Sequence, residues 1–283
     1  MTNKKQDKYS AVWVSHSSMG DYLKCPRAYY LKNIYKDPKT GRKVNIVSPA
    51  LSLGSAVHEV VEGLANYKAD ERFNHDLLEE YDRAWQKLSG RRGGFKNIDE
   101  ENEFKERGKE MIKRVIENPG PLNNKTVKIP EGHNGMPPNF FLSVEENIII
   151  CGKIDWLEYI PEDDSVRILD FKTGKWDEDE ESLQLPIYLL LLTTLQKRKI
   201  SGASYWYLNR EDEPQSKTLP DLEESRRRVL DVALKVKHAR EVRVFECPKG
   251  SDGCFACRPF EKILKGEAEF VGKGEYQDLY IVL

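Results

Sequence analysis

Apolar residues recur at helical spacing through the first part of the chain. The pattern predicts four helices, over residues 15–35, 51–67, 74–88 and 99–117. Cys25-Pro26 interrupts the first of them, because proline breaks the interior of a helix. We expect a loop over residues 41–49. The Pro- and Gly-rich residues 118–139 are expected to be irregular or to hold one short edge strand.

From residue 140 the pattern changes to short runs rich in Ile, Val and aromatic side chains, which are typical of strands. Residues 141–160 and 165–174 flank the turn-forming run PEDDS, so we expect them to form an antiparallel hairpin. The acidic run 177–182 is expected to open a Leu-rich helix that ends near residue 195. A strand and a helix follow, over residues 202–209 and 221–239.

This order of elements predicts an α/β fold in which a central mixed β-sheet is flanked by helices. At 283 residues the chain can bury one large core, and we expect a single elaborated domain over residues 1–283. The composition, 39% hydrophobic and 33% charged, is typical of a soluble globular protein. The longest apolar run, 183–195, is too short to cross a bilayer, and the first residues lack an apolar leader. We therefore expect a cytoplasmic protein with no membrane partner.

The net charge of -2 gives no support to a protein that coats nucleic acid indiscriminately, because such proteins carry a basic excess. Two local clusters, Arg91-Arg92 and Arg226-Arg227-Arg228, are either solvated faces or contacts to phosphate.

The cysteines are more informative. There are five, an odd number in a chain without an export signal, which argues against a disulfide framework. Cys247, Cys254 and Cys257 fall within eleven residues, and such clustering indicates a metal site or reactive thiols. Cys151 is isolated in a predicted strand, where a small buried apolar side chain is the usual role.

The segment ILDFKTG, residues 168–174, places a carboxylate and an ammonium group two residues apart in an otherwise apolar strand. Side chains alternate along a strand, so Asp170 and Lys172 share one face, while Leu169 and Phe171 share the other. Taken alone, the pair indicates a structural ion pair on a half-exposed strand.

The hairpin register adds a second carboxylate. The midpoint between Asp155 and Asp170 falls in the predicted turn, so a symmetric hairpin sets the two aspartates roughly opposite, with Cβ atoms about 5 Å apart. Two carboxylates at this distance repel unless a cation lies between them, and Mg²⁺ or Mn²⁺ suits oxygen ligands. Lys172 would then lie beside the ion, where its charge stabilises the extra negative charge on a reacting phosphorus.

Four motifs in order, GSAVHEVVE, GKIDW, ILDFKTG and LQLPIY, resemble those of RecB-type nucleases in the PD-(D/E)xK superfamily. The resemblance implies a restriction-endonuclease-like core over about residues 51–210. It also implies divalent-metal ligands and a catalytic lysine: His58, Asp155, Asp170 and Lys172, with the Phe171 carbonyl as a further candidate ligand. Gln184 and Tyr188 match the family's Gln-x-x-x-Tyr motif and share a helix face, from which they would steady the lysine or the substrate strand. Glu145 and Glu146 are lesser acidic candidates and are more typical of solvated side chains.

YLKCPRAYYL and CPKGSDGCFAC resemble a subset of these nucleases in which one N-terminal and three C-terminal cysteines hold a [4Fe-4S] cluster. The corresponding residues here are Cys25, Cys247, Cys254 and Cys257. The spacing departs from the family pattern, because the third C-terminal cysteine precedes the Cys-x-x-Cys pair. Zinc is the alternative, since four thiolates accept either metal. Such a centre would join helix 15–35 to the segment 240–265 in a cysteine-linked lobe.

The resemblance favours a Mg²⁺- or Mn²⁺-dependent DNA exonuclease that cleaves single-stranded or frayed DNA by attack of a metal-activated water. Recombination, repair or phage DNA processing would be its setting, with a helicase or recombination protein as partner. The aromatic segments YYLKNIY and SYWYLN would either stack on unpaired bases or pack in the core.

Other functions are a CRISPR-associated adaptation nuclease, a catalytically inactive module that docks DNA or a helicase, and a redox protein built around the cysteines. The set of polar motif residues argues against an inactive module, because packing alone does not require it.

Overall fold

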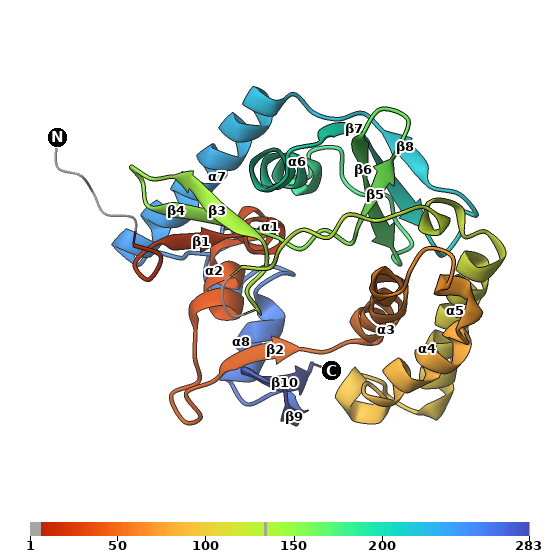
Figure 1. Ribbon diagram of the computed structural model, residues 1–283. Helices are drawn as coiled ribbons and strands as arrows, with labels where there is room; N and C mark the ends of the chain where they lie inside the picture. The colour runs from red at the N-terminus through yellow and green to blue at the C-terminus, as the bar shows by residue number, and fades with distance from the viewer. Residues whose placement is uncertain (1–6, 133–134, 283) are drawn as a thin grey trace.

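The computed structural model describes residues 7–132 and 135–282, and in these residues the strands form three small sheets among helices (Figure 1). In spatial order the sheets are β1-β4-β3, β2-β10-β9 and β5-β6-β7-β8. The strands are β1 (Val12–Val14), β2 (Lys43–Ile46), β3 (Asn139–Ser143), β4 (Ile148–Cys151), β5 (Trp156–Ile160), β6 (Ser165–Lys172), β7 (Lys199–Tyr207), β8 (Gln215–Lys217), β9 (Glu269–Lys273) and β10 (Gln277–Ile281). Each sheet pairs strands in both directions, which confirms the expected mixed α/β fold.

Except for α8, which was not predicted, the helices fall close to the predicted ranges. They are α1 (His16–Lys24), α2 (Pro26–Tyr29), α3 (Pro49–Gly63), α4 (Leu77–Gln86), α5 (Ile98–Glu117), α6 (Gln184–Leu195), α7 (Leu222–Val242) and α8 (Arg258–Leu264). The break predicted at Cys25-Pro26 is confirmed, because Cys25 is extended and separates α1 from α2, which runs on into a π-helical turn at Tyr30–Ile34. Among the described residues, no helix combines the length and the apolar character that crossing a membrane requires.

The four-stranded sheet β5-β6-β7-β8 lies between two hydrophobic layers, because its side chains alternate between its faces. Val166 and Ile168 of β6 face α6 and α7, whereas Leu169 and Phe171 face the layer of α3, α4 and α5 (Figure 1). Strand β6 is therefore buried on both faces, which explains its apolar sequence. Helix α6 provides the crossover that the parallel pair β6 and β7 requires.

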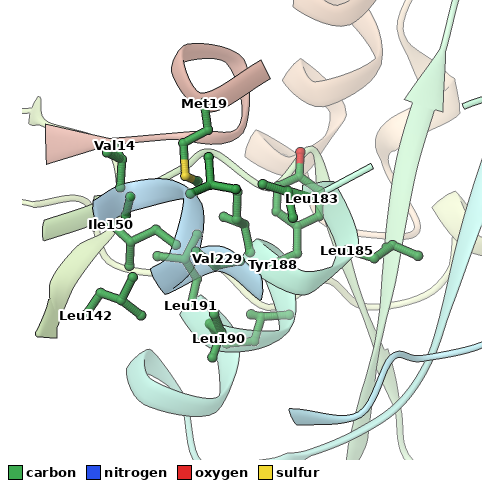
Figure 2. Close-up of a cluster of buried hydrophobic side chains, with 14 of the residues drawn as sticks. Val14, Met19, Leu142, Ile150, Leu183, Leu185, Tyr188, Leu190, Leu191 and Val229 are labelled. Carbon is green, nitrogen blue, oxygen red and sulfur yellow. The ribbon is translucent and has the colours of Figure 1, made fainter. Parts of the chain in front are cut away.

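Helix α6 is buried on nearly all sides, between the four-stranded sheet, α1, α7 and the sheet β1-β4-β3. Figure 2 shows side chains of this cluster, with Met19 of α1, Ile150 of β4 and Val229 of α7 meeting Leu191 of α6. Tyr188 joins the same cluster through its ring, and its hydroxyl lies at the edge, away from the aliphatic side chains (Figure 2). A polar group is thereby carried on an otherwise apolar helix.

Three predictions about single elements are wrong. Residues 141–160 are not one strand: β4 pairs with β1 and β3, and the chain changes sheets before β5 begins. Gly152 lies at this change, where an added Cβ would lie 3.0 Å from Leu191 Cδ1, so glycine allows the close approach to α6. The acidic run 177–182 is outside the helix, which begins at Gln184. The loop expected at 41–49 contains β2.

Strand β2 pairs in parallel with β10, and β10 pairs with β9. The sequence did not predict this sheet, because β2 and β10 are separated by more than two hundred residues. It packs beside α2 and α8 on a small apolar cluster that includes Leu31, Val44 and Phe260. The short strands β1 and β8 were also missed, in segments that read as a polar tail and a charged linker.

Candidate active site and cysteine site

Two aspartates meet at the start of the β5-β6 hairpin. Asp155 immediately precedes β5, and the register pairs Trp156 with Leu169, so Asp155 falls opposite Asp170. The roughly opposite placement expected from the hairpin midpoint is therefore observed. The Phe171 N–H donates a 3.0 Å hydrogen bond to Asp155 Oδ2, which fixes that carboxylate against the edge of β6.

The charge of Asp170 disfavours the ionisation of Asp155. Burial, followed by the nearby charge of Asp170, raises the pKa of Asp155 to about 7. Asp170 is only 2% exposed, so water screens little of this repulsion. A divalent cation between or beside the two groups would remove the cost, because an opposite charge favours the ionised form.

Helix α3 brings a histidine and a glutamate to Asp155. His58 Nδ1 lies 2.8 Å from Glu62 Oε1 and 3.5 Å from Asp155 Oδ2. One ligand atom from each of these three residues lies within 4.8 Å of the other two, a spacing that could hold a metal ion. An imidazole nitrogen and carboxylate oxygens are suitable donors for Mn²⁺, and carboxylates for Mg²⁺. The donor set therefore fits a divalent ion.

Charge complementarity holds this group together. Burial lowers the pKa of His58, but the hydrogen bond to Glu62 and the charge of Asp155 outweigh it and raise that pKa above its ordinary value. Burial raises the pKa of Glu62, but the hydrogen bonds and charges of His58 and Lys153 outweigh it. The pKa of Glu62 is therefore below its ordinary value. Lys153 forms an ion pair with Glu62.

Glu62 was not among the predicted site residues. Its signal was present in the motif HEVVE, because His58 and Glu62 are four residues apart and share one face of a helix. Asp170, predicted as a ligand with His58 and Asp155, is not part of the group within 4.8 Å and contacts other partners.

Those partners come from α6, one turn apart. Gln184 Nε2 donates to Asp170 Oδ1 at 2.8 Å, and the Tyr188 hydroxyl donates to the same oxygen at 3.1 Å. Gln184 Nε2 also lies 3.1 Å from the Tyr188 hydroxyl. Burial, followed by the charge of Asp170, raises the pKa of Tyr188 well above its ordinary value, so the hydroxyl keeps its proton as a donor.

Lys172 completes the network on the same face of β6. Its Nζ lies 2.9 Å from Asp170 Oδ2 and 2.9 Å from Glu178 Oε2, and it donates a 2.5 Å hydrogen bond to Gln184 Oε1. Burial lowers the pKa of Lys172, but the charges of Asp170 and Glu178 outweigh it and raise that pKa. The ammonium group therefore stays charged in its buried position.

Asp170 Oδ2 faces the catalytic lysine candidate. Within the described part of the chain this buried atom accepts no directed hydrogen bond, but Lys172 Nζ lies 2.9 Å from it. The ammonium group therefore balances the charge of this oxygen, and a divalent cation would share the carboxylate with Lys172.

Glu178 is a second residue that the sequence did not single out, since it lies in the acidic run between β6 and α6. The Tyr207 hydroxyl lies 3.1 Å from the Glu178 N–H, and Lys172 holds the side chain. His16, at the start of α1, lies 3.2 Å from Ser182 Oγ and 3.9 Å from Glu178 Oε1. The first helix therefore contacts the surroundings of the lysine.

The four predicted cysteines come together in space. The Sγ atoms of Cys25, Cys247, Cys254 and Cys257 all lie within 4.8 Å of one another, and those of Cys254 and Cys257 are 3.8 Å apart. Gly253 has a φ of +68°, and an added Cβ would lie 3.1 Å from Cys257 Sγ, so the loop needs glycine there. The described cysteines are all free thiols.

The sulfur atoms share the features of a metal site. Burial raises the pKa of Cys25 to about 12. Burial also raises the pKa of Cys254, but the N–H groups of Cys257 and Ala256 outweigh it, so that pKa falls to about 7. Lys249 donates its N–H to Cys247 Sγ at 3.4 Å. Four cysteine sulfurs this close together suit a soft metal, which binds them as thiolates.

The remaining candidates lie elsewhere or are paired. Cys151 is half-buried and donates to the Val14 carbonyl at 3.5 Å. Glu146 pairs with Lys237 of α7. The two arginine clusters contact the protein itself, through Arg91 to Glu269, Arg92 to the Lys273 carbonyl, Arg226 to the Leu142 carbonyl, Arg227 to Glu224, and Arg228 to Glu181.

Comparison with known families accounts for this arrangement. A sequence model of the PD-(D/E)XK nuclease superfamily matches residues 13–260. A search of curated proteins finds no significant match. The matched region contains all the motif residues of the hairpin and α6, together with the four clustered cysteines. The chain belongs to the PD-(D/E)XK nuclease superfamily, a membership that implies metal-dependent cleavage of nucleic acid.

Proposed function

We propose that the protein is a RecB-type DNA exonuclease that hydrolyses single-stranded or frayed DNA ends, in recombination, repair or phage DNA processing. One observation carries the proposal: Asp155 and Asp170 lie opposite each other, and Lys172, Gln184 and Tyr188 converge on Asp170. Packing does not require such a set of buried polar groups, whereas phosphodiester hydrolysis uses each of them.

His58, Glu62 and Asp155 would hold a divalent ion, with the Asp170 carboxylate, opposite Asp155, as the next group available to it. The ion supplies Lewis-acid polarisation of the phosphate and a nucleophilic water at neutral pH. The Phe171 carbonyl is retained as a further candidate ligand. Mg²⁺ and Mn²⁺ both suit this donor set.

Lys172 places a fixed positive charge beside Asp170, where it can stabilise the negative charge that develops on the phosphate oxygens. Gln184 holds Lys172 through its carbonyl oxygen and Asp170 through its amide nitrogen, so it fixes the distance between the two. Tyr188 orients the carboxylate by donating to the same oxygen. These contacts preorganise the site and lower the reorganisation that the reaction requires.

End-labelled DNA tests the proposal. Single-stranded and double-stranded oligonucleotides, labelled at the 5′ or the 3′ end, are incubated with Mg²⁺, Mn²⁺ or EDTA. We expect metal-dependent release of short products from one end of the single strand. Cleavage in EDTA would overturn the metal mechanism, and cleavage of a closed circular single strand would overturn the exonuclease assignment.

We also propose that Cys25, Cys247, Cys254 and Cys257 bind a metal. Four sulfurs around one tetrahedral Zn²⁺ lie about 3.8 Å apart, given Zn–S bonds of about 2.3 Å. Cys254 Sγ and Cys257 Sγ are 3.8 Å apart, which is this spacing and also the contact distance of two thiols. A [4Fe-4S] cluster, which the related nucleases imply, binds each cysteine to a different iron and spaces the sulfurs farther apart, and zinc is the alternative.

Elemental measurement on anaerobically purified protein decides between these metals. Four irons with acid-labile sulfide per chain is the expected result. One zinc per chain and no absorption in the visible range would replace the cluster by a zinc ion. Protein that contains neither metal and keeps its thermal stability would refute a metal centre of either kind.

A further inference from the structure

A cavity lined by arginines and aromatic rings, side chains that suit a nucleic acid, lies beside the cysteine site. It has a volume of about 530 Å³, within the usual range of small-molecule sites. Three arginines, two aromatic rings and one aliphatic side chain line it: Arg27, Arg240, Arg243, Tyr30, Phe245 and Ile34. These residues come from α2, the π-helical turn that follows it, and the C-terminal end of α7.

The aromatic wall is a stack of two half-buried rings. Tyr30 and Phe245 have ring centroids 5.1 Å apart and an interplanar angle of 29°. The guanidinium of Arg27 lies 5.6 Å from the centroid of Tyr30, and an ion pair with Glu261 fixes it. A planar ligand that enters this cavity would extend the existing stack of Arg27, Tyr30 and Phe245.

The opposite wall is positively charged. Arg240 and Arg243 are exposed, and among the residues that the structure describes no carboxylate forms an ion pair with either guanidinium. Burial, followed by the charges of Lys36 and Arg240, lowers the pKa of Lys43, which shows that further cations lie close by. By contrast, the arginines of the two clusters are paired with carboxylates or carbonyls. Arg240 does contact the Tyr29 hydroxyl, but burial raises the pKa of that hydroxyl, so it stays neutral and leaves the arginine charge uncompensated. In a chain of net charge -2, such a pair of arginines favours an anionic ligand.

The conformation of Arg243 points the same way. This residue ends α7 with a φ of 57°, in the left-handed region where glycine or asparagine is usual. The left-handed conformation costs arginine conformational free energy, and glycine would end the helix without that cost. The guanidinium is therefore present at this position despite the strain.

We propose that this cavity binds a nucleotide of the single-stranded DNA substrate, at a distance along the strand from the nuclease site. Arg240 and Arg243 pair with the two phosphates that flank it, and its base extends the stack that Arg27, Tyr30 and Phe245 form. Stacking on aromatic rings with arginine contacts to the backbone is the general mode of single-strand binding. In a duplex the faces of the bases are covered by their neighbours, so the same cavity selects against double-stranded DNA. The inference rests on the proposed function, to which it adds a strand-binding site.

Binding without cleavage tests the site. The affinity of the protein for a labelled oligothymidylate is measured by fluorescence anisotropy in EDTA, over a range of salt concentrations. We expect R240Q/R243Q to bind about tenfold more weakly at 0.1 M salt. The slope of log K against log salt should fall by about 1.4, which is about 0.7 for each arginine that no longer neutralises a phosphate. The matched control is R83Q/R107Q, which removes two arginines from α4 and α5 and should leave both quantities unchanged.

An oligonucleotide without bases separates stacking from charge. Y30L should weaken binding of oligothymidylate by about tenfold and leave binding of an abasic strand of equal length unchanged. Equal losses on both strands would overturn the stacking role of Tyr30. Equal affinities of R240Q/R243Q and R83Q/R107Q for the oligonucleotide would overturn the site as a whole, and this test remains valid if Y30L folds poorly.

Kinetics then connects the cavity to the nuclease. On long single strands R240Q/R243Q should raise KM about tenfold without changing kcat, because the cavity holds the strand and does not touch the reacting phosphate. A fall in kcat with unchanged KM would contradict that role. If the protein cleaves no DNA at all, the proposed function fails, while the binding measurements in EDTA still decide whether the strand site exists.

Discussion

The hairpin site and the cysteine site are both candidate metal centres, but they relate differently to the rest of the molecule. The carboxylates of the hairpin site already have protein partners: Asp155 accepts from a backbone N–H, and Asp170 from Gln184 and Tyr188. The sulfurs of the cysteine site lie among one another and accept N–H groups from their own short segments, as Cys247 does from Lys249 and Cys257 does from Cys254. The hairpin carboxylates are therefore held by groups from other elements before an ion arrives, whereas the backbone hydrogen bonds of the sulfurs are local.

The two sites also join different parts of the chain. His58, Asp155, Asp170 and Gln184 lie on elements that pack against the central sheet in any case. Cys25 and Cys257 are separated by more than two hundred residues, and a metal between them closes a very long loop. We conclude that loss of metal at the first site should remove activity, and that loss at the second should remove stability. Four measurements test this contrast.

The largest effect is expected from K172A. The variant loses the positive charge beside Asp170, and we expect the cleavage rate to fall at least about 1,000-fold. The control is K175A, an exposed lysine three residues away, which should keep full activity. Initial rates on end-labelled DNA give the result, and circular dichroism shows that both variants are folded. Comparable rates for the two variants would remove Lys172 from the mechanism.

The second effect concerns stability. C254S/C257S removes two of the four sulfurs, and we expect a loss of about 4 kcal/mol, because a cross-link between distant segments restricts the unfolded chain. The melting temperature should then fall by about 10 °C. C151S, which alters the half-buried thiol of β4, serves as the control and should change little. An unchanged melting temperature in C254S/C257S would contradict the structural role of the site.

A smaller effect is expected for the glutamate of α3. E62Q weakens one member of the group around His58, so the Mn²⁺ concentration that gives half-maximal activity should rise by about 10-fold to 100-fold. E59Q changes an exposed glutamate on the same helix that pairs with Lys87, and should behave as the unmodified protein. Identical metal titrations for both variants would exclude Glu62 as a ligand.

The smallest effect on stability is expected for Asp155, where one substitution should raise stability and remove activity. The pKa of Asp155 is raised to about 7, so the folded protein without metal loses stability as the pH rises from the ordinary aspartate range through 7. At pH 8 in EDTA we expect D155N to be more stable by about 2 kcal/mol, because it removes a charge that burial and Asp170 disfavour. The same variant should lose activity. D163N, in the exposed turn, is the control, and a destabilised D155N in EDTA would contradict this electrostatic account.

The sequence predicted the centre of the site because local rules are sufficient there. Strand alternation placed Asp170 and Lys172 together, the turn fixed the register with Asp155, and helical spacing paired Gln184 with Tyr188. Glu62 obeyed the same helical rule and was overlooked. Glu178 was not predictable in this way, because several acidic residues precede α6 and only the packing of β6 against β7 brings this one to Lys172.

Long-range pairing accounts for the other failures. Nothing in residues 43–46 indicates a partner at residues 277–281, so β2 read as a loop. The acidic run 177–182 has the composition of a helix start, but Lys172 and the Tyr207 hydroxyl hold Glu178 outside the helix, which begins at Gln184. The division of the chain into a core over residues 51–210 and a cysteine-linked lobe stays a prediction.

The pairing of β2 with β10 sets an order of events during synthesis. All residues of the hairpin site lie before residue 210, so they are synthesised before the three C-terminal cysteines. Strand β2 has no partner until residues 277–281 emerge, and until then it presents an open edge to other chains. The nascent chain therefore contains every residue of the nuclease site before Cys25 and β2 can meet their partners.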